Sequence, residues 1–237
     1  MRRQLQISLA LMLAGSAFVV SAQSNASSSP APGQASSTTA PAATPGPQAP
    51  VQSKVAMCIG CHGIQGYQAT FPEVHKVPMI AGQNAKYIAA ALTAYAKGDR
   101  KHPTMRGIAL PLADQDIAEI SEYYAGLAKV DAVPAVAEAP ADIKKLLDKG
   151  ACASCHGANF SKPIDGTYPK IAGQHADYLY VALKSYQADG KQPYLGRANA
   201  VMAGQVKQFS HAELKQLSQY LASLPSELRT VPQSRFR

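Results

Sequence analysis

The sequence carries the pentapeptide Cys-x-x-Cys-His twice, and the two copies use all four cysteines of the chain. They occupy residues 58–62 and 152–156. In such a motif the two thiols can add across the vinyl groups of a haem to form thioethers, while the adjacent histidine is held at the iron as an axial ligand. The spacing therefore predicts two covalently attached c-type haems. The predicted thioether positions are Cys58, Cys61, Cys152 and Cys155, and the predicted axial histidines are His62 and His156.

Zinc ribbons and thioredoxin-like redox sites also use Cys-x-x-Cys pairs, so these two classes of site are the alternatives. A zinc site needs four ligands that converge on one metal. Here the two pairs lie about 90 residues apart, and each falls within its own repeat unit. Two complete motifs with no cysteine left over favour haem over zinc or a disulfide.

One methionine in each half of the chain is the candidate sixth ligand of its iron. Met105 and Met202 each lie twelve residues before the apolar series that ends their half, in a segment expected to be a loop. A thioether at this position raises the reduction potential and closes the iron to small ligands. Core packing is the commoner use of methionine, but the matched placement favours ligation. His102, three residues before Met105, is the competing ligand.

The segments that must position these groups also repeat, so the chain after about residue 51 divides into two similar halves. A Pro-x-Ile-Ala-Gly-Gln block follows each motif, at residues 78–83 and 169–174. A helix-like segment follows each block, and each half then ends on an apolar series at helical spacing. The matched positions of the two series are Ile117, Ile120, Tyr124 and Leu127 against Leu214, Leu217, Leu221 and Leu224. These patterns predict an all-α chain of two tandem units.

The backbone of each block has an expected role at the axial histidine. A ligating imidazole usually donates its other ring N–H to a carbonyl or carboxylate, which fixes the tautomer and raises the basicity of the ligand. The carbonyl oxygens of Pro78 and Pro169 are the expected acceptors.

Capping residues and a proline-containing join set the expected boundaries. Ser210 and Glu213 form a capping box at the start of the last helix, and Pro225 closes it. In the first half, Asp114 is the expected cap of the equivalent helix. Two prolines among alanines and valines mark a linker. The predicted boundaries are a first domain at residues 51–130, a linker at 131–141, a second domain at 142–228 and a tail at 229–237.

Two further segments precede the repeat. Residues 1–22 have a basic start, an apolar stretch and a small-residue cleavage site, which together predict a cleaved signal peptide. The apolar stretch is shorter than the ~20 residues that a helix needs to span a bilayer. Residues 23–50 are almost entirely Ser, Ala, Thr, Pro, Gly and Gln, a composition typical of a disordered leader. We expect a periplasmic protein whose leader either holds the globular part off a membrane or a partner or has no specific role.

The chain after the leader resembles cytochrome c4, a tandem fusion of two class I cytochrome c domains. The resemblance rests on the two Cys-x-x-Cys-His-Gly motifs, the two Pro-x-Ile-Ala-Gly-Gln blocks, and the placement of Met105 and Met202. It implies two all-α lobes related by a pseudo-twofold axis, and two low-spin haems with His/Met ligation that exchange electrons. It also implies a periplasmic carrier that feeds membrane-bound terminal oxidases, often of the cbb3 type.

The charge distribution indicates how such a carrier would dock. The formal net charge is +8, and loss of two arginines with the signal peptide leaves about +6. Residues 54–131 hold eight basic and seven acidic side chains, whereas residues 132–237 hold thirteen and eight. A basic second half can steer docking onto an acidic partner, with a solvated surface bias as the alternative. No nucleic-acid target is expected, because the chain is predicted to be exported and has no basic patch interleaved with aromatic residues.

Three functions compete at this point. The first is an electron carrier that receives electrons from a quinol-oxidising complex or dehydrogenase and delivers them to a terminal oxidase. The second is a haem enzyme of the peroxidase or thiosulfate-oxidising type, which needs an iron with an open site; the two matched methionines argue against it. The third is a dedicated cytochrome subunit of a membrane dehydrogenase. The leader would suit this role, and so would peripheral association with a membrane. The sequence favours the carrier, which is not an enzyme.

Overall fold

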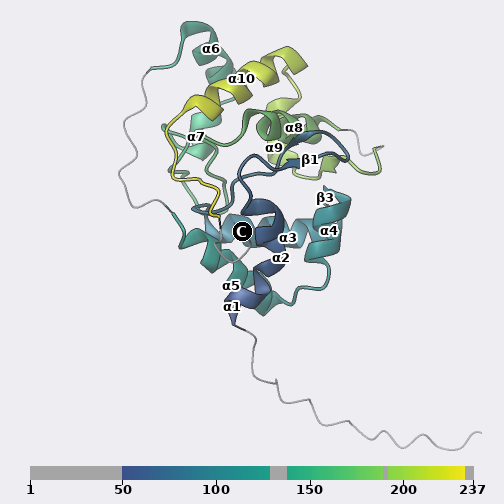
Figure 1. Ribbon diagram of the computed structural model, residues 1–237. Helices are drawn as coiled ribbons and strands as arrows, with labels where there is room; N and C mark the ends of the chain where they lie inside the picture. Colours follow the sequence, from purple (N-terminus) through teal and green to yellow (C-terminus); the bar gives the residue numbers. More distant parts are fainter. Residues whose placement is uncertain (1–49, 129–137, 189–191, 233–237) are drawn as a thin grey trace, which may run out of the picture. The chain divides into compact units, whose positions relative to one another are not determined.

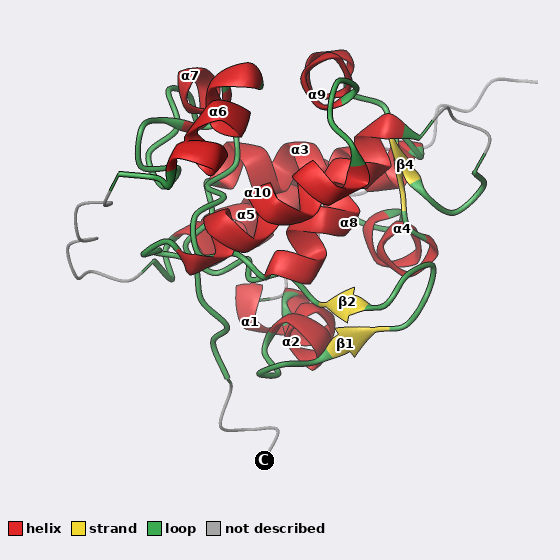
Figure 2. Ribbon diagram, turned by 90° about the horizontal axis from the view of Figure 1, so that it is seen from above, coloured by secondary structure: helices red, strands yellow, loops and turns green. Residues whose placement is uncertain are grey.

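The computed structural model describes residues 50–128, 138–188 and 192–232. The expected signal peptide, nearly all of the leader and most of the linker lie outside these residues. Within them the chain forms helices joined by loops, with strands of only two residues each (Figures 1 and 2). The all-α prediction is confirmed. None of the described helices is long and apolar enough to span a membrane.

The described helices fall into two sets that follow the two halves of the sequence. We call residues 50–128 the first lobe, and residues 138–188 with 192–228 the second lobe. The helices of the first lobe are α1 (Val51–Lys54), α2 (Ala56–His62), α3 (Ala85–Lys97), α4 (Pro103–Ala109) and α5 (Asp114–Ala125). Those of the second lobe are α6 (Ala141–Lys149), α7 (Cys152–His156), α8 (Ala176–Gln187), α9 (Ala200–Val206) and α10 (His211–Ser223).

Each lobe has its own apolar core, built on the final helix of its half. Helix α3 packs on α5 in the first lobe, and α8 packs on α10 in the second. The inward-facing positions recur every three or four residues, as one face of a helix requires. The buried members of the two series are Ile117, Ile120 and Tyr124 in α5, and Leu214, Leu217 and Leu221 in α10. The repeat in the sequence is therefore a repeat of helix packing.

The two final helices begin differently from one another. At α10 the Ser210 hydroxyl accepts from the Glu213 N–H at 3.3 Å, and the Glu213 carboxylate accepts from the Ser210 N–H at 2.7 Å, so the predicted capping box is confirmed. The expected cap of α5 was wrong. Asp114 is the first helical residue, and the carboxylate of Asp116 instead accepts from the Ala113 N–H at 3.1 Å.

A glycine in each Pro-x-Ile-Ala-Gly-Gln block ties that block to the final helix. The N–H of Gly82 donates to the carbonyl of Tyr124, and that of Gly173 donates to the carbonyl of Leu221, each at 2.8 Å. Both glycines have positive φ, at +86° and +66°. A Cβ at Gly82 would also lie 2.6 Å from the carbonyl oxygen of Glu227. These two positions need glycine for conformation and for space.

Backbone pairing joins the two lobes. Strand β1 (Gln68–Ala69) pairs with β2 (His75–Lys76) inside the first lobe, whereas β3 (Arg100–Lys101) pairs with β4 (Gly196–Arg197) of the second, both antiparallel. The chain after the second lobe also returns to the first, where the Arg229 N–H donates to the carbonyl of Ala81 at 3.1 Å. The first lobe is therefore joined by backbone hydrogen bonds both to the second lobe and to the chain that follows the second lobe.

Candidate haem sites

The structure brings all of the predicted site residues to one cavity of about 780 Å³ that both lobes line. These residues are Cys58, Cys61, His62, Pro78, Met105, Cys152, Cys155, His156, Pro169 and Met202. Apolar side chains of both cores, including Ile88 and Leu179, form much of the remaining wall.

Each Cys-x-x-Cys-His motif lies in a short helix, which places its three reactive groups on one face. Helix α2 ends at His62 and α7 ends at His156. Residues three and four positions apart are neighbours on a helix, so Cys61 and His62 both lie beside Cys58. None of the four cysteines is in a disulfide. Burial raises the pKa of the Cys58 thiol and raises that of Cys152 to about 11, so both thiols are protonated at neutral pH.

A backbone carbonyl binds the Nδ1 atom of each motif histidine. His62 Nδ1 lies 2.8 Å from the carbonyl oxygen of Pro78, and His156 Nδ1 lies 2.9 Å from that of Pro169. Because a carbonyl oxygen can only accept, Nδ1 donates and Nε2 keeps the lone pair that a metal needs. Burial lowers the pKa of both imidazoles, which favours the neutral, ligating form. Ligation of iron by these histidines stays a prediction.

Met105 and Met202 reach the cavity from short helices, so the expectation that they lie in loops was wrong. Met105 belongs to α4 and Met202 to α9, and each helix has seven residues. So short a helix completes too few turns to show an apolar period in the sequence. Both side chains are partly buried against the core of their own lobe.

Each of these methionines follows an N-cap residue by three positions. His102 Nδ1 accepts from the Met105 N–H at 3.3 Å, and Asn199 Oδ1 accepts from the Met202 N–H at 2.9 Å. Asn199 was not expected at the site, although its spacing from Met202 equals that of His102 from Met105. This matched spacing is the signal that could have found it. The cap hydrogen bond uses Nδ1 of His102, the residue that the sequence offered as an alternative to Met105 at the iron.

Comparisons with known proteins agree with this geometry. Residues 140–225 match the family model of cytochrome c. Cytochrome c4 from Thiocapsa roseopersicina is 30% identical over 193 residues, which cover 75% of this chain and 92% of the relative. The chain belongs to the cytochrome c4 family.

Two further relatives extend the comparison. The structure of Acidithiobacillus ferrooxidans cytochrome c4 covers 72% of this chain and 99% of its own, at 26% identity and a TM-score of 0.54. A thiosulfate dehydrogenase electron acceptor from Thiomonas intermedia is 28% identical, over 77% of this chain and 85% of the relative. As a member of the cytochrome c4 family, this chain carries covalently bound c-type haem at two sites and is an electron carrier, not an enzyme.

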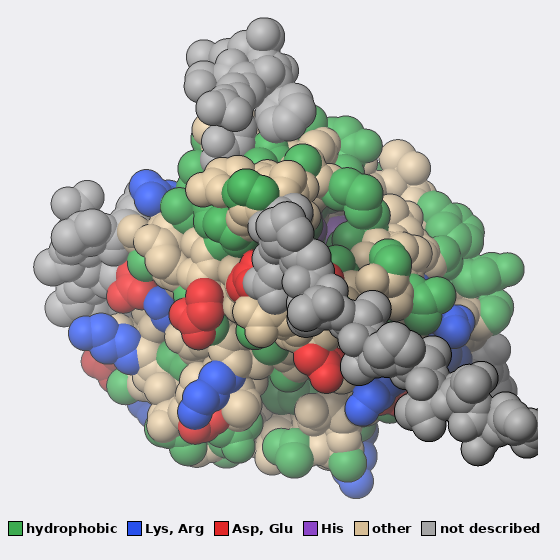
Figure 3. Space-filling view, turned by 90° about the horizontal axis from the view of Figure 1, so that it is seen from below, with side chains coloured by type: hydrophobic (Ala, Val, Ile, Leu, Met, Phe, Trp, Pro, Cys, Tyr) green, Lys and Arg blue, Asp and Glu red, His purple; other side chains and the backbone are tan. Residues whose placement is uncertain are grey.

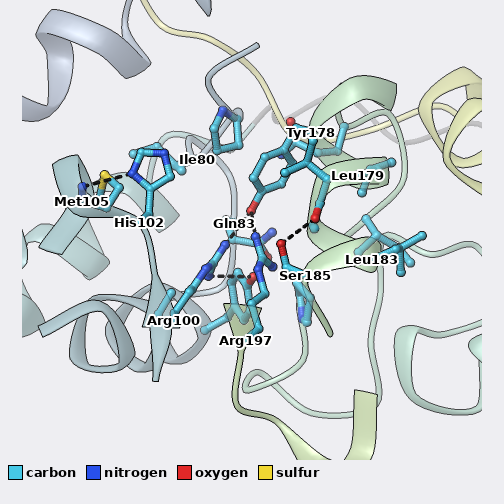
Figure 4. A pocket seen from close by; sticks show the side chains of 18 of the residues that line it. Ile80, Gln83, Arg100, His102, Met105, Tyr178, Leu179, Leu183, Ser185 and Arg197 are labelled. Carbon is cyan, nitrogen blue, oxygen red and sulfur yellow. Dashed lines mark hydrogen bonds between the residues drawn. The ribbon is translucent and has the colours of Figure 1, made fainter. Parts of the chain in front are cut away.

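Two arginines line the cytochrome c4 cavity where the lobes meet (Figure 4). Arg100 is 9% exposed, and Arg197 is partly buried. The Tyr178 hydroxyl accepts from Arg100 Nη2 at 2.6 Å and from Arg197 Nη2 at 3.3 Å. The Arg100 guanidinium also lies 4.6 Å from the ring centre of Tyr95. Burial by itself raises the pKa of Tyr178, but the two arginines outweigh burial and lower that pKa to about 8.

These arginines have no anionic partner in the described part of the chain. Among those residues no carboxylate lies within salt-bridge distance of either guanidinium, and Arg100 Nε has no hydrogen-bond partner. A buried cation without a counterion is costly. Each haem brings two carboxylates, so a haem in this cavity would supply the missing anion. The cavity therefore fits the haems of a cytochrome c4. It offers thiols, imidazoles and methionine sulfurs, apolar walls, and two arginines that lack a carboxylate partner.

Proposed function

We propose that this protein carries single electrons in the periplasm, from a quinol-oxidising complex or dehydrogenase to a membrane-bound terminal oxidase. An oxidase of the cbb3 type is the candidate acceptor. We assign His62 and Met105 as the axial ligands of the first haem, and His156 and Met202 as those of the second. Export rests on the signal peptide predicted at residues 1–22.

The main support for this proposal is that the motif cysteines, the motif histidine and the candidate methionine of both halves line one cavity. Two redox groups held in a shared cavity favour passage of an electron within the molecule. When bound, haem supplies reversible one-electron chemistry at its iron. The chain holds each cofactor through two thioethers, fixes the imidazole through Nδ1, and offers a methionine sulfur that keeps small molecules off the iron.

The surface of the described residues suits transient docking. On the face in Figure 3, basic and acidic side chains lie beside one another with apolar side chains between them. Exposed apolar residues adjoin the proposed haem-binding residues in the sequence. Met57 precedes Cys58 and is 59% exposed, and Val201 precedes Met202 and is 58% exposed. A mixed apolar and charged surface is typical of short-lived redox complexes.

The first test is the carbon monoxide difference spectrum of the fully reduced protein, matured in a periplasm and normalised to its haem content. We expect no binding, because each iron has two protein ligands. Carbon monoxide binding at about half or more of the haem would reveal a displaceable ligand and favour the alternative that the protein is a haem enzyme. Oxidation of the reduced protein by membranes that contain only a cbb3 oxidase then tests the acceptor.

A second candidate partner is a thiosulfate dehydrogenase. The similarity to the Thiomonas intermedia protein, whose name describes an electron acceptor of that enzyme, favours it. In this case the protein receives electrons from the dehydrogenase. It remains an electron carrier and does not itself catalyse the oxidation of thiosulfate. Mixing the oxidised protein with thiosulfate and a purified thiosulfate dehydrogenase distinguishes the two donors. Rapid reduction would support the dehydrogenase, and reduction only by a quinol-oxidising complex would support the first proposal.

A further inference from the structure

The glutamine that closes each Pro-x-Ile-Ala-Gly-Gln block reaches across to the other lobe. Gln174 Nε2 donates to the Met79 carbonyl at 2.8 Å, and Gln174 Oε1 accepts from the Met79 N–H at 3.0 Å. Gln83 repeats this arrangement, donating to the Lys170 carbonyl and accepting from the Lys170 N–H, both at 2.9 Å. Both glutamines are 4% exposed. The two side chains form reciprocal clamps between the lobes.

In the first lobe the clamped peptide group is the one that binds the motif histidine. The carbonyl of Pro78 and the N–H of Met79 belong to the same peptide group. That group accepts from His62 Nδ1 at 2.8 Å on one side and donates to Gln174 Oε1 at 3.0 Å on the other. A hydrogen-bonded chain therefore runs from a histidine of the first lobe to a glutamine of the second.

The second lobe carries the mirror arrangement. The peptide group between Pro169 and Lys170 accepts from His156 Nδ1 at 2.9 Å and donates to Gln83 Oε1 at 2.9 Å. The two chains thus cross the lobe boundary in opposite directions. Each iron site is hydrogen-bonded, through one peptide group, to a side chain of the lobe that holds the other iron site.

The orientation of each glutamine amide follows from its partners. A peptide N–H can only donate and a peptide carbonyl can only accept, so Oε1 must face the N–H and Nε2 the carbonyl. Each Oε1 also accepts from the backbone N–H of the following residue, Asn84 at 2.9 Å or His175 at 3.0 Å. Each acceptor is therefore positioned by its own lobe and acts on the other.

We propose that Gln174 tunes the reduction potential of the iron bound by His62, and that Gln83 tunes that of the iron bound by His156. Hydrogen bonds in a chain polarise one another. An acceptor at the peptide N–H makes its carbonyl a stronger acceptor, and a stronger acceptor at Nδ1 makes the imidazole a more basic ligand. A more basic ligand stabilises the oxidised iron and lowers its potential. The proposal rests on the ligand assignment made above.

This crossed arrangement makes both tuning effects depend on contact between the lobes. Any movement that parts the lobes breaks both chains together, because each chain has one end in each lobe. Loss of the glutamine acceptor weakens the carbonyl as an acceptor and raises the potential.

The test replaces one glutamine at a time by leucine, which has a similar volume and no amide, in the haem-loaded protein. The potential of each haem is read from its own hyperfine-shifted methyl resonances during an NMR redox titration. In Gln174→Leu we expect the potential of the haem attached at Cys58 to rise while the other haem keeps its potential. In Gln83→Leu we expect the reverse. Asn84→Ala is the matched control, because it removes the Asn84 Nδ2 hydrogen bond to the Tyr168 carbonyl at 3.0 Å, which also joins the lobes but lies outside both chains.

The outcomes separate this proposal from the ligand assignment. The absorption band of methionine-ligated ferric haem is recorded first, and its absence at either haem in the wild type would overturn the assignment. With that band present, unshifted potentials, or a shift at the haem of the substituted lobe, would overturn the crossed tuning alone. Equal shifts in Gln174→Leu and Asn84→Ala would also overturn it. If a leucine variant does not mature, Gln174→Asn and Gln83→Asn, with a side chain one methylene shorter, are held to the same crossed pattern.

Discussion

Arg100 Nη2 donates to the hydroxyl of Tyr178 at 2.6 Å, and this bond joins the first lobe to the second. Arg197, which lies opposite Arg100 in the β3–β4 pair, donates to the same hydroxyl. Two like charges that share one phenol repel each other, and an anion placed near them offsets this repulsion. The carboxylates of the haems are the anions that the proposed function brings to this cavity.

Replacing Arg100 by glutamine is expected to lower the potential of the haem whose carboxylates it pairs with. The guanidinium favours the reduced iron, which carries less positive charge. Its removal also leaves a buried carboxylate with one cation fewer beside it, which raises the pKa of that carboxyl group. The potential of the variant should therefore depend on pH more strongly than that of the wild type on the acid side of neutrality, below the range in which Tyr178 titrates. Spectroelectrochemical titration at several pH values measures both effects.

The control for this charge change is Lys207→Gln. It removes one positive charge from an exposed side chain of the second lobe, and we expect the potentials to stay the same. If Arg100→Gln kept the wild-type potential at every pH, the haem carboxylates would have to lie away from the arginines.

Met105→Ala and Met202→Ala should each open one iron. The haem stays attached because its thioethers are intact, but the distal thioether is gone, so the potential falls and carbon monoxide binds at about half of the haem. Carbon monoxide titration of the reduced variants measures this fraction. Met57→Ala is the matched control, because Met57 also lines the cavity but is 59% exposed and has no predicted ligand role. A Met105 or Met202 variant that binds no carbon monoxide would mean that another side chain is the ligand.

Local patterns in the sequence predicted the parts of the fold that local physics determines. The Cys-x-x-Cys-His spacing needs one turn of helix, and the series ending at Leu127 and Leu224 show helical spacing over several turns. Pro78 and Pro169 were expected beside the histidines, and the structure places their carbonyls at hydrogen-bond distance from Nδ1. All of these features repeat in both halves of the chain.

The lobe boundary could not be predicted in this way. Gln83 clamps Lys170, 87 residues further along the chain, and β3 meets β4 across a similar separation. No periodicity encodes such a contact, because it depends on how two finished lobes pack. The short helices of Met105 and Met202 were missed for another reason. Their signals were a proline at the first position of α4 and the polar cap Asn199 before α9.

Loss of one cysteine pair should affect one lobe. The variant with Cys58→Ala and Cys61→Ala is expected to carry one haem per chain, because the second motif lies in a separate helix and a separate core. The first lobe should lose most of its stability, since a unit of this size has little apolar core besides its cofactor. Haem content per chain and thermal unfolding followed by circular dichroism measure the two effects. The reciprocal variant, Cys152→Ala with Cys155→Ala, is the control, and loss of both haems in either variant would contradict independent lobes.

The capping box of α10 predicts a dependence of stability on acid pH. The Ser210 N–H, the Lys149 ammonium and the Ser210 hydroxyl lower the pKa of Glu213 to about 2, from an ordinary value of 4.5. Because the folded-state pKa is the lower one, ionised Glu213 stabilises the fold fully above about pH 4.5, and this contribution is lost as pH falls towards 2. The free energy of unfolding in urea should therefore fall less steeply over this range in Glu213→Gln than in the wild type. Glu122→Gln, at an exposed position of α5, should follow the wild-type slope, and a Glu213→Gln curve parallel to the wild type would rule out this role for the carboxylate.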